Sequence, residues 1–344
     1  MHQIQTHIFC CDWGTSSLRL RLVERETLHV AAHVQTAEGI GRLFSIWSSL
    51  EASGESRQDY LLEALSRHVS KIQEQVSFAV SHIPIVMSGM ASSSIGLKEI
   101  PYAHLPFSIV GKDISAEYIA ETPDFAHDIY LISGVQSDSD VIRGEEIEVI
   151  GLSAMGTLNI PEFSGGNILV LPGTHAKHIL IKDQKIVSFK TFMTGEFFSL
   201  LTENSILKDS IHTLDSSELT HSAYRTAFSN GVETARANNL LHASFLARTN
   251  HLFGKFTKEE NSFFLSGLVI GYELLDLSEE SEVSRLVICC GEKLLEQYRL
   301  ACQVLGYINV TYIPSATLEQ AIVMGQIAVY NRFSKNNPNE KYHV

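Results

Sequence analysis

The chain has 344 residues, of which 44% are hydrophobic and 19% are charged, as in ordinary globular proteins. This length allows two domains, each with its own hydrophobic core. The 26 basic and 39 acidic residues give a net charge of -13. That charge argues against nucleic acid or an anionic membrane as the main partner, but a nucleotide needs only a local site.

The cysteines and the N-terminus indicate a compartment. Cys10 and Cys11 are adjacent, as are Cys289 and Cys290, Cys302 stands alone, and no CxxC spacing occurs. This pattern favours reduced, buried thiols and argues against zinc. A basic region followed by an apolar run is missing from the N-terminus, and no stretch of 18 apolar residues occurs. We therefore expect a cytoplasmic protein that does not enter the membrane; the sequence leaves room for a homodimer.

The first predicted element is a hairpin. The apolar run 7–11 predicts a buried strand, and the alternating run 18–23 predicts its return. The turn between them holds Asp12, Gly14, Thr15 and Ser16. Its backbone N–H groups and hydroxyls can approach a phosphate, while the acid can hold the water shell of Mg²⁺. The alternative is an ordinary hairpin turn with a satisfied aspartate.

A third, more exposed strand is predicted over 28–34, a loop over 39–43, a helix over 61–76 and a short buried strand over 84–87. A loop rich in glycine and serine follows over 88–96, with Gly89, Met90 and Ser92 as candidate ligand contacts. Open α/β sheets bind ligands at the carboxyl ends of their strands. The alternative is a plain surface loop.

The strand 129–134 ends the first half, and a charged segment follows over 138–146. Asp140, Arg143 and the pair Glu145 and Glu146 could supply a general base, an anion clamp and polar contacts to a hydroxylated substrate. The alternative is a solvated helix face. Residues 156–166 predict a hinge, since they are rich in Gly, Pro, Asn and Ser.

A second hairpin opens the second half, with strands over 167–171 and 178–182 and a third strand over 186–190. Its turn offers Gly173, Thr174, His175 and Lys177 as phosphate contacts. The chain therefore repeats an architecture without repeating a sequence. A helix runs through 197–201; just before it, Thr194 and Glu196 either contact a substrate or cap and charge the start of the helix.

Residues 220–277 are predicted to be mostly helical, and the glycines at 267 and 271 allow close approach to another helix or a ligand. The strand 285–290 ends at Gly291 and Glu292, where a nucleotide or phosphate can rest on backbone and helix N-terminus. A last strand (309–313), a last helix (318–329) and a frayed tail follow. The motifs GxxxxGK[ST], GxGxxG, GxSxG and HExxH do not occur, which disfavours P-loop, dinucleotide, α/β-hydrolase and zincin chemistry.

Two similar halves with two phosphate hairpins and a late glycine at a strand end resemble the actin/hexokinase/Hsp70 superfamily. More closely, the chain resembles the 2-dehydro-3-deoxygalactonokinase family. The segments that carry this resemblance follow one order along nearly the whole chain: 12–15 with 18–19, 89–90 with 99–102, 134–136 with 140–146, 171–177, 188–196 and 266–273. The resemblance implies an α/β fold of two ribonuclease H-like (actin-like ATPase) domains, here 1–158 and 159–344, with a cleft between them.

The implied activity is transfer of the γ-phosphoryl group of ATP to the 6-hydroxyl of 2-dehydro-3-deoxy-D-galactonate. Asp12 would hold Mg²⁺ through water and be as important as the base, for which Asp140 ranks before Glu145. The remaining implied roles are these: outer phosphates at Gly14, Thr15, Ser16, Gly173 and Thr174, with charge from Lys177 or His175; adenosine near Gly291 and Glu292; substrate at Gly89, Met90, Ser92, Arg143, Glu146, Thr194 and Glu196.

The chain departs from the family pattern at one place. Where the family usually has a segment like GSRQGW, this chain has Ser94, Ile95 and Leu97 at the positions of the arginine, glutamine and tryptophan. An arginine there would be a natural carboxylate clamp, worth about 1.5–3 kcal/mol. The departure raises a second hypothesis, the same chemistry on another sugar or sugar acid. A third is an ATP-binding regulatory protein without an acceptor.

Overall fold

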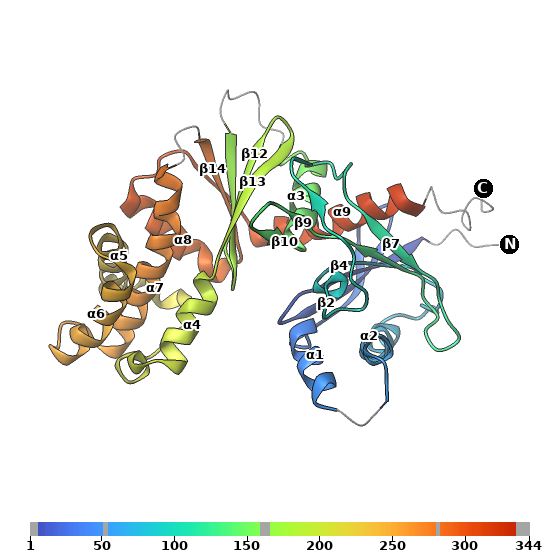
Figure 1. Cartoon of the computed structure of the whole chain (residues 1–344), viewed down its shortest axis with the longest axis horizontal. Coiled ribbons are helices and arrows are strands. Elements are labelled where there is room, and N and C mark those ends of the chain that lie inside the picture. The colour runs from blue at the N-terminus through green and yellow to red at the C-terminus, as the bar shows by residue number, and fades with distance from the viewer. Residues whose placement is uncertain (1–5, 51–53, 159–165, 280–282, 335–344) are drawn as a thin grey trace. The chain divides into compact units, whose positions relative to one another are not determined.

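The computed structural model describes residues 6–50, 54–158, 166–279 and 283–334. Contacts divide the chain into two compact units (Figure 1). Unit 1 comprises Met1–Pro161, Gln184–Ile186 and Glu319–Val344, and unit 2 comprises Glu162–Asp183 and Val187–Leu318. The domain ranges 1–158 and 159–344 stay a prediction, although unit 1 also takes most of the last helix. Most of the predicted hinge, 159–165, lies outside the described residues.

Unit 1 is built on a six-stranded sheet in the order β3-β2-β1-β4-β8-β7. β1 is antiparallel to β2 and parallel to β4, and β8 continues the parallel part. The predicted first hairpin is confirmed. The strands are β1 (His7–Trp13), β2 (Leu18–Glu24), β3 (Val30–Thr36), β4 (Ile85–Gly89), β7 (Ala116–Ile119) and β8 (Ile129–Ile132).

Two helices pack on this sheet, α1 (Ile40–Ser49) and α2 (Arg57–Gln73). The prediction of a loop over 39–43 is wrong, because α1 begins at Ile40. Ile40 and Leu43 are buried in the core of unit 1. A Cβ on Gly39 would lie 2.2 Å from the carbonyl oxygen of Thr15, so glycine permits the close approach of this helix start to the first hairpin turn.

The rest of unit 1 carries short strands and two helices that pack together. α3 (Glu145–Ala154) meets α9 (Ser315–Ser334), since a Cβ on Gly151 would lie 1.7 Å from the carbonyl oxygen of Ala321. Gln326 of α9 donates to the carbonyl oxygen of Cys11 and to Ser88 Oγ. These contacts explain why α9 belongs to unit 1. The short elements are η1 (Met90–Ser92), β5 (Ala103–His104), β6 (Phe107–Ser108), β9 (Val135–Gln136) and β10 (Val141–Ile142).

Unit 2 repeats the strand order of unit 1 with different sequence. Its strands lie in the order β15-β14-β11-β12-β13, with β11 antiparallel to β12 and parallel to β14. This order and these pairings match β8-β4-β1-β2-β3, so both units have the ribonuclease H-like arrangement and the predicted repeat is confirmed. The strands are β11 (Gly166–Leu171), β12 (Ala176–Lys182), β13 (Lys185–Phe192), β14 (Val283–Cys289) and β15 (Val310–Ile313).

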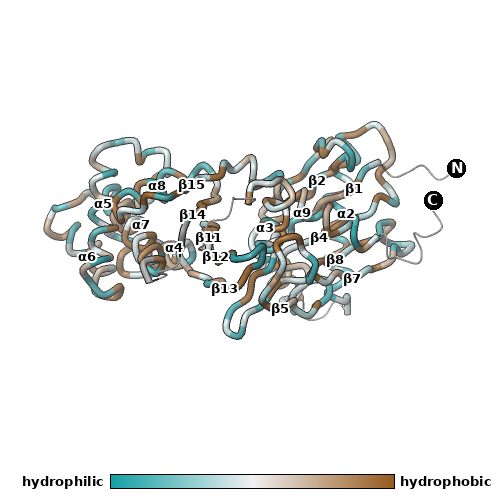
Figure 2. The backbone as a smooth tube through the Cα atoms, turned by 90° about the horizontal axis from the view of Figure 1, so that it is seen from above, coloured by the Kyte–Doolittle hydropathy of each residue, from teal (hydrophilic) through white to brown (hydrophobic). Residues whose placement is uncertain are grey.

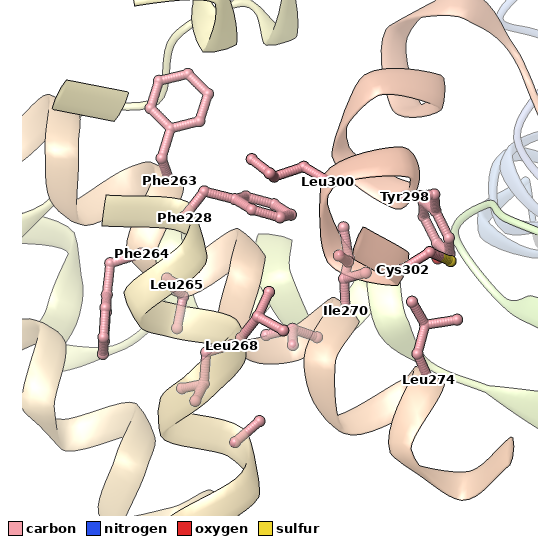
Figure 3. Packing of buried hydrophobic residues seen from close by; sticks show 14 of the residues in the cluster. Phe228, Phe263, Phe264, Leu265, Leu268, Ile270, Leu274, Tyr298, Leu300 and Cys302 are labelled. Carbon is pink, nitrogen blue, oxygen red and sulfur yellow. The ribbon is translucent and has the colours of Figure 1, made fainter. Parts of the chain in front are cut away.

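The helices of unit 2 pack together with strands β11 and β14 in one hydrophobic core cluster. α5 and α7 approach closely at two glycines that have no side chain to keep them apart. A Cβ on Gly231 would lie 2.0 Å from the carbonyl oxygen of Phe264, and one on Gly267 would lie 2.1 Å from that of Phe228. Figure 3 displays Phe228, Leu268 and Leu300 within this cluster. The elements are α4 (Thr194–Asn204), η2 (Ile206–Ser210), η3 (Ser216–Thr220), α5 (Ser222–Ala237), α6 (Leu240–Leu252), α7 (Lys258–Leu275), η4 (Asp276–Glu279) and α8 (Glu292–Leu305).

Hydrophobic residues follow the central strands β1 and β4 and the helix α7, as Figure 2 shows. All five cysteines are free and buried. Among residues 6–50, 54–158, 166–279 and 283–334, no helix has both the length and the apolar character to cross a bilayer.

Candidate functional site

The first hairpin turn presents Asp12 at the end of β1. The strand register places Asp12 opposite Arg19, and Arg19 Nη1 lies 3.1 Å from Asp12 Oδ2. The turn is closed by a hydrogen bond from the Gly14 N–H to the Ser17 carbonyl oxygen at 2.9 Å. Thr15 and Ser16 are exposed at its tip. The local geometry thus combines exposed hydroxyls with a largely buried carboxylate.

The electrostatics of Asp12 reflect both signs of charge. Burial raises the pKa of its carboxyl group, Arg19 and Arg21 lower that pKa, and Glu145 raises it. Arg21 is 9% exposed, and its Nη1 has no hydrogen-bond partner among the described atoms. A divalent cation bound near Asp12 would offset the cost of keeping this carboxylate charged.

The loop after β4 lies beside this turn. β1 and β4 are parallel, with Trp13 opposite Gly89. Gly89 has a φ of +89°, and a Cβ there would lie 2.7 Å from the Trp13 carbonyl oxygen, so the position requires glycine. Met90 begins the short helix η1, and Ser92 ends it fully buried. The alternative of a plain surface loop is wrong for Ser92.

Arg143 contacts this loop directly. Arg143 Nη1 donates to the carbonyl oxygen of Ser92 at 2.6 Å and to Ser92 Oγ at 2.5 Å. Its guanidinium lies 4.1 Å from the centre of the Tyr102 ring, and its Nε is buried without a hydrogen-bond partner among the described atoms. A guanidinium held between Ser92 and Tyr102 has a fixed direction, which suits recognition of an anionic ligand by its remaining N–H groups.

The start of α3 brings acidic groups to the same part of unit 1. Glu145 Oε2 accepts from the Arg143 N–H at 2.9 Å, and both carboxylate oxygens of Glu146 accept from the Gly144 N–H at 2.9 and 2.8 Å. Glu146 is fully buried, and burial raises its pKa to about 8. The alternative of a solvated helix face is therefore wrong for Glu146.

Glu145, rather than Asp140, is electrostatically coupled to Asp12. Burial, then Glu145 and Asp12, raise the pKa of Glu148 well above its usual value. Asp140 Oδ1 instead accepts from the Val141 N–H at 2.7 Å. Asp140 also lines a separate open pocket with His104 and Gln136. No group of three or more His, Cys, Asp or Glu side chains within the described ranges is arranged to hold a metal directly.

The second hairpin turn, in unit 2, is braced by its own residues and by α4. Lys177 is 6% exposed and donates to the His175 carbonyl oxygen at 2.9 Å. His175 Nε2 lies 2.5 Å from Glu196 Oε2, and the Glu196 N–H donates to the Thr174 carbonyl oxygen at 3.1 Å. A Cβ on Gly195 would lie 2.7 Å from the Gly173 carbonyl oxygen. The turn and the first turn of α4 therefore form one packed piece.

Thr194 does not cap this helix. The N-cap of α4 is Met193, which makes no side-chain capping bond, and Thr194 Oγ1 donates to Glu273 Oε2 at 2.5 Å. The capping interpretation is therefore wrong for Thr194. Glu196 does lie in the first turn, where a negative charge is favourable.

A cavity of about 170 Å³ adjoins the second turn. Gly173 lies at one part of its lining, and the helices α4, α7 and α8 supply most of the rest. Its lining is Gly173, Thr194, Gly195, Phe198, Thr213, Leu214, Ser216, Ser262, Phe263, Ser266, Val269, Ile270, Leu294, Gln297 and Tyr298. This largely apolar lining with a few polar groups suits a flat organic ligand such as a nucleoside.

The residues predicted beside adenosine lie at the start of α8. Gly291 is the N-cap of that helix and Glu292 is its first residue. Glu292 lines a neighbouring cavity of about 380 Å³ together with Asp215, Ser216 and Arg225. Ser216 lines both cavities, so Glu292 lies next to the first cavity rather than in its lining.

Several residues at these places are not among those predicted from the sequence. Tyr102 and Glu273 lie inside segments that carry the family resemblance, and Arg21 shares a strand face with Arg19, so these three had a local signal. Glu148 lies one helical turn after Glu145. Gln297 and Tyr298 had no local signal in the sequence, because only the packing of α8 turns them toward the cavity.

Comparison with known proteins agrees with this arrangement. The family model described as 2-keto-3-deoxy-galactonokinase matches residues 12–325. The Escherichia coli (strain K12) protein 2-dehydro-3-deoxygalactonokinase is 27% identical over 317 residues, covering 90% of this chain and 94% of the relative. A Rhizobium meliloti (strain 1021) protein described as a 2-dehydro-3-deoxygalactonokinase, DgoK1, is 30% identical over 307 residues, covering 87% and 89%.

A solved structure agrees in fold as well. The crystal structure of a Sinorhizobium meliloti protein described as a 2-dehydro-3-deoxygalactonokinase has a TM-score of 0.72 to this chain at 28% identity, covering 95% of this chain and 99% of that one. The family match runs from Asp12, in the first hairpin, to Gly325, in the last helix. The chain belongs to the 2-keto-3-deoxy-galactonokinase family.

Proposed function

We propose that this protein transfers the γ-phosphoryl group of ATP to the 6-hydroxyl of 2-dehydro-3-deoxy-D-galactonate. The observation that carries the proposal is the family match from residue 12 to residue 325, which includes both hairpin turns. The E. coli relative bears the name of this activity. The third hypothesis, a regulatory protein without an acceptor, is disfavoured by membership of a kinase family.

We place the nucleoside of ATP in the cavity of unit 2. Its lining joins Gly173 of the second turn to the apolar side chains of α7 and α8, which suits phosphates at one end and a base at the other. Thr174, His175 and Lys177 would serve the phosphates from this turn. We also propose that Gly14, Thr15 and Ser16 contact the outer phosphates. Thr15 and Ser16 are exposed in the first turn, as Thr174 is in the second.

The acceptor site belongs to unit 1 in this proposal. The guanidinium of Arg143, held by Ser92 and the Tyr102 ring, suits the carboxylate of a sugar acid, with Gly89, Met90 and Ser92 beside it. Fully buried Glu146 would act through Gly144, whose N–H it binds, rather than at the acceptor. The predictions of substrate contact for Glu146, Thr194 and Glu196 have less support than the prediction for Arg143.

Asp12 would hold Mg²⁺ through water, and the ion would neutralise charge on the transferred phosphoryl group when bound. Of the two candidate bases, Glu145 has the better support, because it shares the electrostatic environment of Asp12. We expect Glu145→Gln to lower kcat more than Asp140→Asn does. Five buried free cysteines support a reducing compartment such as the cytoplasm.

The test is coupled ATP consumption with Mg²⁺, with and without 2-dehydro-3-deoxy-D-galactonate. We expect turnover that depends on the acceptor. Arg143→Met should raise the KM for the acceptor at least 10-fold and leave the KM for ATP within about 2-fold, because one charged hydrogen-bond donor pair is worth about 1.5–3 kcal/mol. The matched control is Arg67→Met on the exposed face of α2. Acceptor-independent ATP hydrolysis would contradict the proposal.

The second candidate function is the same transfer to another sugar or sugar acid. It is favoured by the loop 94–97, where Leu97 is only 3% exposed and packs in the core of unit 1, as Ile95 does in part. These side chains do not replace the family's arginine. A panel of sugar acids in the same assay discriminates, since turnover of another acid without response to 2-dehydro-3-deoxy-D-galactonate would establish this alternative.

A further inference from the structure

One buried carboxylate, that of Glu273 on α7, lies behind the cavity of unit 2. Only 3% of Glu273 is exposed. Its Oε2 accepts from Thr194 Oγ1 at 2.5 Å and from Tyr298 OH at 2.7 Å, and its Oε1 lies 3.0 Å from His178 Nε2. This single side chain therefore joins α4, α8 and β12 to α7.

The donors in this cluster are determined by their surroundings. Burial, and then the nearby Glu273, raise the pKa of Tyr298 well above its usual value, so the phenol keeps its proton and donates. His178 Nδ1 is buried without a hydrogen-bond partner among the described atoms, whereas Nε2 lies 3.0 Å from Glu273 Oε1, where it can donate to that carboxylate. Three donors satisfy a carboxylate that would otherwise be costly to bury.

Two of these donors line the cavity, whereas Glu273 does not. Thr194 and Tyr298 belong to the lining. Thr194 is also the first residue of α4, and the two residues after it contact the second hairpin turn. Gly195 packs on Gly173, and the Glu196 N–H donates to the Thr174 carbonyl oxygen. Glu273 can thus influence both the wall of the cavity and the turn beside it without touching a ligand.

We propose that Glu273 is a positioning residue for the nucleotide. By holding Thr194 and Tyr298 at once, it keeps the cavity wall and the second hairpin turn in one geometry before ATP binds. This inference rests on the proposed function, which places the nucleoside in this cavity. Pre-organisation of this kind acts on affinity, since the ordering cost is met in the free protein. The group that Glu273 positions is the nucleotide, so the KM for the acceptor should not respond.

The experiment compares Glu273→Met with Glu273→Gln. Methionine is of similar length but cannot accept the three hydrogen bonds. Glutamine has the same shape, keeps one oxygen for the two hydroxyls and keeps a polar group facing His178 Nε2. We expect Glu273→Met to weaken binding of a non-hydrolysable ATP analogue, measured by titration calorimetry, at least 10-fold. Glu273→Gln should stay within about 3-fold.

Kinetics supply a readout that general destabilisation would not move. Glu273→Met should raise the KM for ATP about as much as the Kd, with kcat within about 3-fold and the KM for the acceptor unchanged. The matched control is Tyr307→Phe, which removes a hydroxyl bonded to the carbonyl oxygen of Leu274, one residue from Glu273 and outside the cavity lining. Its Kd should match that of the wild type.

A second pair covers the case in which Glu273→Met does not fold. Thr194→Ser keeps the hydroxyl that reaches Glu273, and Thr194→Val removes it at similar volume. We expect only the valine variant to lose nucleotide affinity. A wild-type protein that binds no ATP analogue overturns the proposed function itself. Wild-type binding together with unchanged binding by folded Glu273→Met, or by Thr194→Val, overturns only the role of Glu273.

Discussion

Units 1 and 2 share a strand order but differ in the surroundings of their buried carboxylates. In unit 1, Asp12, Glu146 and Glu148 lie close enough to Glu145 that each pKa is raised by burial and by that like charge. In unit 2, Glu273 is surrounded by three hydrogen-bond donors. One scaffold therefore supports a strained cluster of acids in one copy and a satisfied, isolated acid in the other.

The difference indicates a division of labour. Clustered carboxylates with raised pKa values respond strongly to a cation or a proton, and such groups are typical of chemical steps. A carboxylate satisfied by three hydrogen-bond donors has little left to offer a ligand, so its value lies in holding other groups in place. Changes to the acid cluster of unit 1 should therefore act mainly on kcat, and changes around Glu273 in unit 2 should act on nucleotide affinity or stability.

The largest expected effect is that of Asp12→Asn. Loss of the carboxylate that we assign to Mg²⁺ should lower kcat about 10³-fold, which corresponds to about 4 kcal/mol of transition-state stabilisation. Binding of an ATP analogue without Mg²⁺ should stay within about 3-fold, since the cavity belongs to unit 2. Asp59→Asn on α2 is the control. Equal losses of kcat and of metal-free binding would break the comparison between the units.

The next effect is that of Gly195→Ala in unit 2. A Cβ there would lie 2.7 Å from the Gly173 carbonyl oxygen, so the second hairpin turn must move. We expect the KM for ATP to rise about 10-fold with a smaller change in kcat, because misplaced phosphate contacts weaken binding. Ser199→Ala, on the exposed side of α4, should behave as the wild type. A pure loss of kcat would assign the turn to chemistry instead.

A smaller effect concerns the pH dependence of stability. The pKa of Glu146 is raised from 4.5 to about 8, so the folded protein holds a proton that the unfolded chain releases. The stability tied to that proton is complete below pH 4.5 and is lost as pH rises to about 8. The midpoint of thermal unfolding should therefore fall over this window, and Glu146→Gln should flatten the curve.

Other groups also titrate over this window, so the readout is the difference between Glu146→Gln and the wild type. The exposed Glu63→Gln variant on α2 should keep the wild-type slope. Parallel curves for Glu146→Gln and the wild type would mean that Glu146 is charged in the folded protein, and would remove one member from the cluster of unit 1.

The smallest effect is expected for Thr257→Ala. Thr257 and Glu260 form a capping box at the start of α7. Its loss should cost about 1 kcal/mol of stability in unit 2 and leave kcat and both KM values unchanged. Thr234→Ala, which removes an exposed hydroxyl within α5, is the control. A change in the KM for ATP would mean that the start of α7 also shapes the cavity.

The sequence was sufficient for both hairpins, because each pairs apolar strands around a polar turn that local periodicity reveals. It was insufficient for α1, whose start at Ile40 depends on contact between Gly39 and Thr15. The same limit applies to α9. Most of this helix belongs to unit 1 because it packs on α3, which lies more than 150 residues earlier in the chain.

The candidate site divides along the same line. Charge density beside a strand was enough to name Arg143 and Glu145 as candidates, and their roles stay predictions. The cluster around Glu273 was not, because its partners lie 25, 79 and 95 residues away and only folding brings them together.

The reactivity of the buried cysteines reports on opening of the folded structure. Burial raises the pKa values of Cys10, Cys290 and Cys302 to about 12, so almost no thiolate exists at neutral pH until the structure opens. Cys10 and Cys11 report on unit 1, and the other three cysteines report on unit 2. The rate of cysteine alkylation, measured for each peptide, would report the opening of each unit separately in the unmodified chain. ATP should slow alkylation in one unit more than in the other.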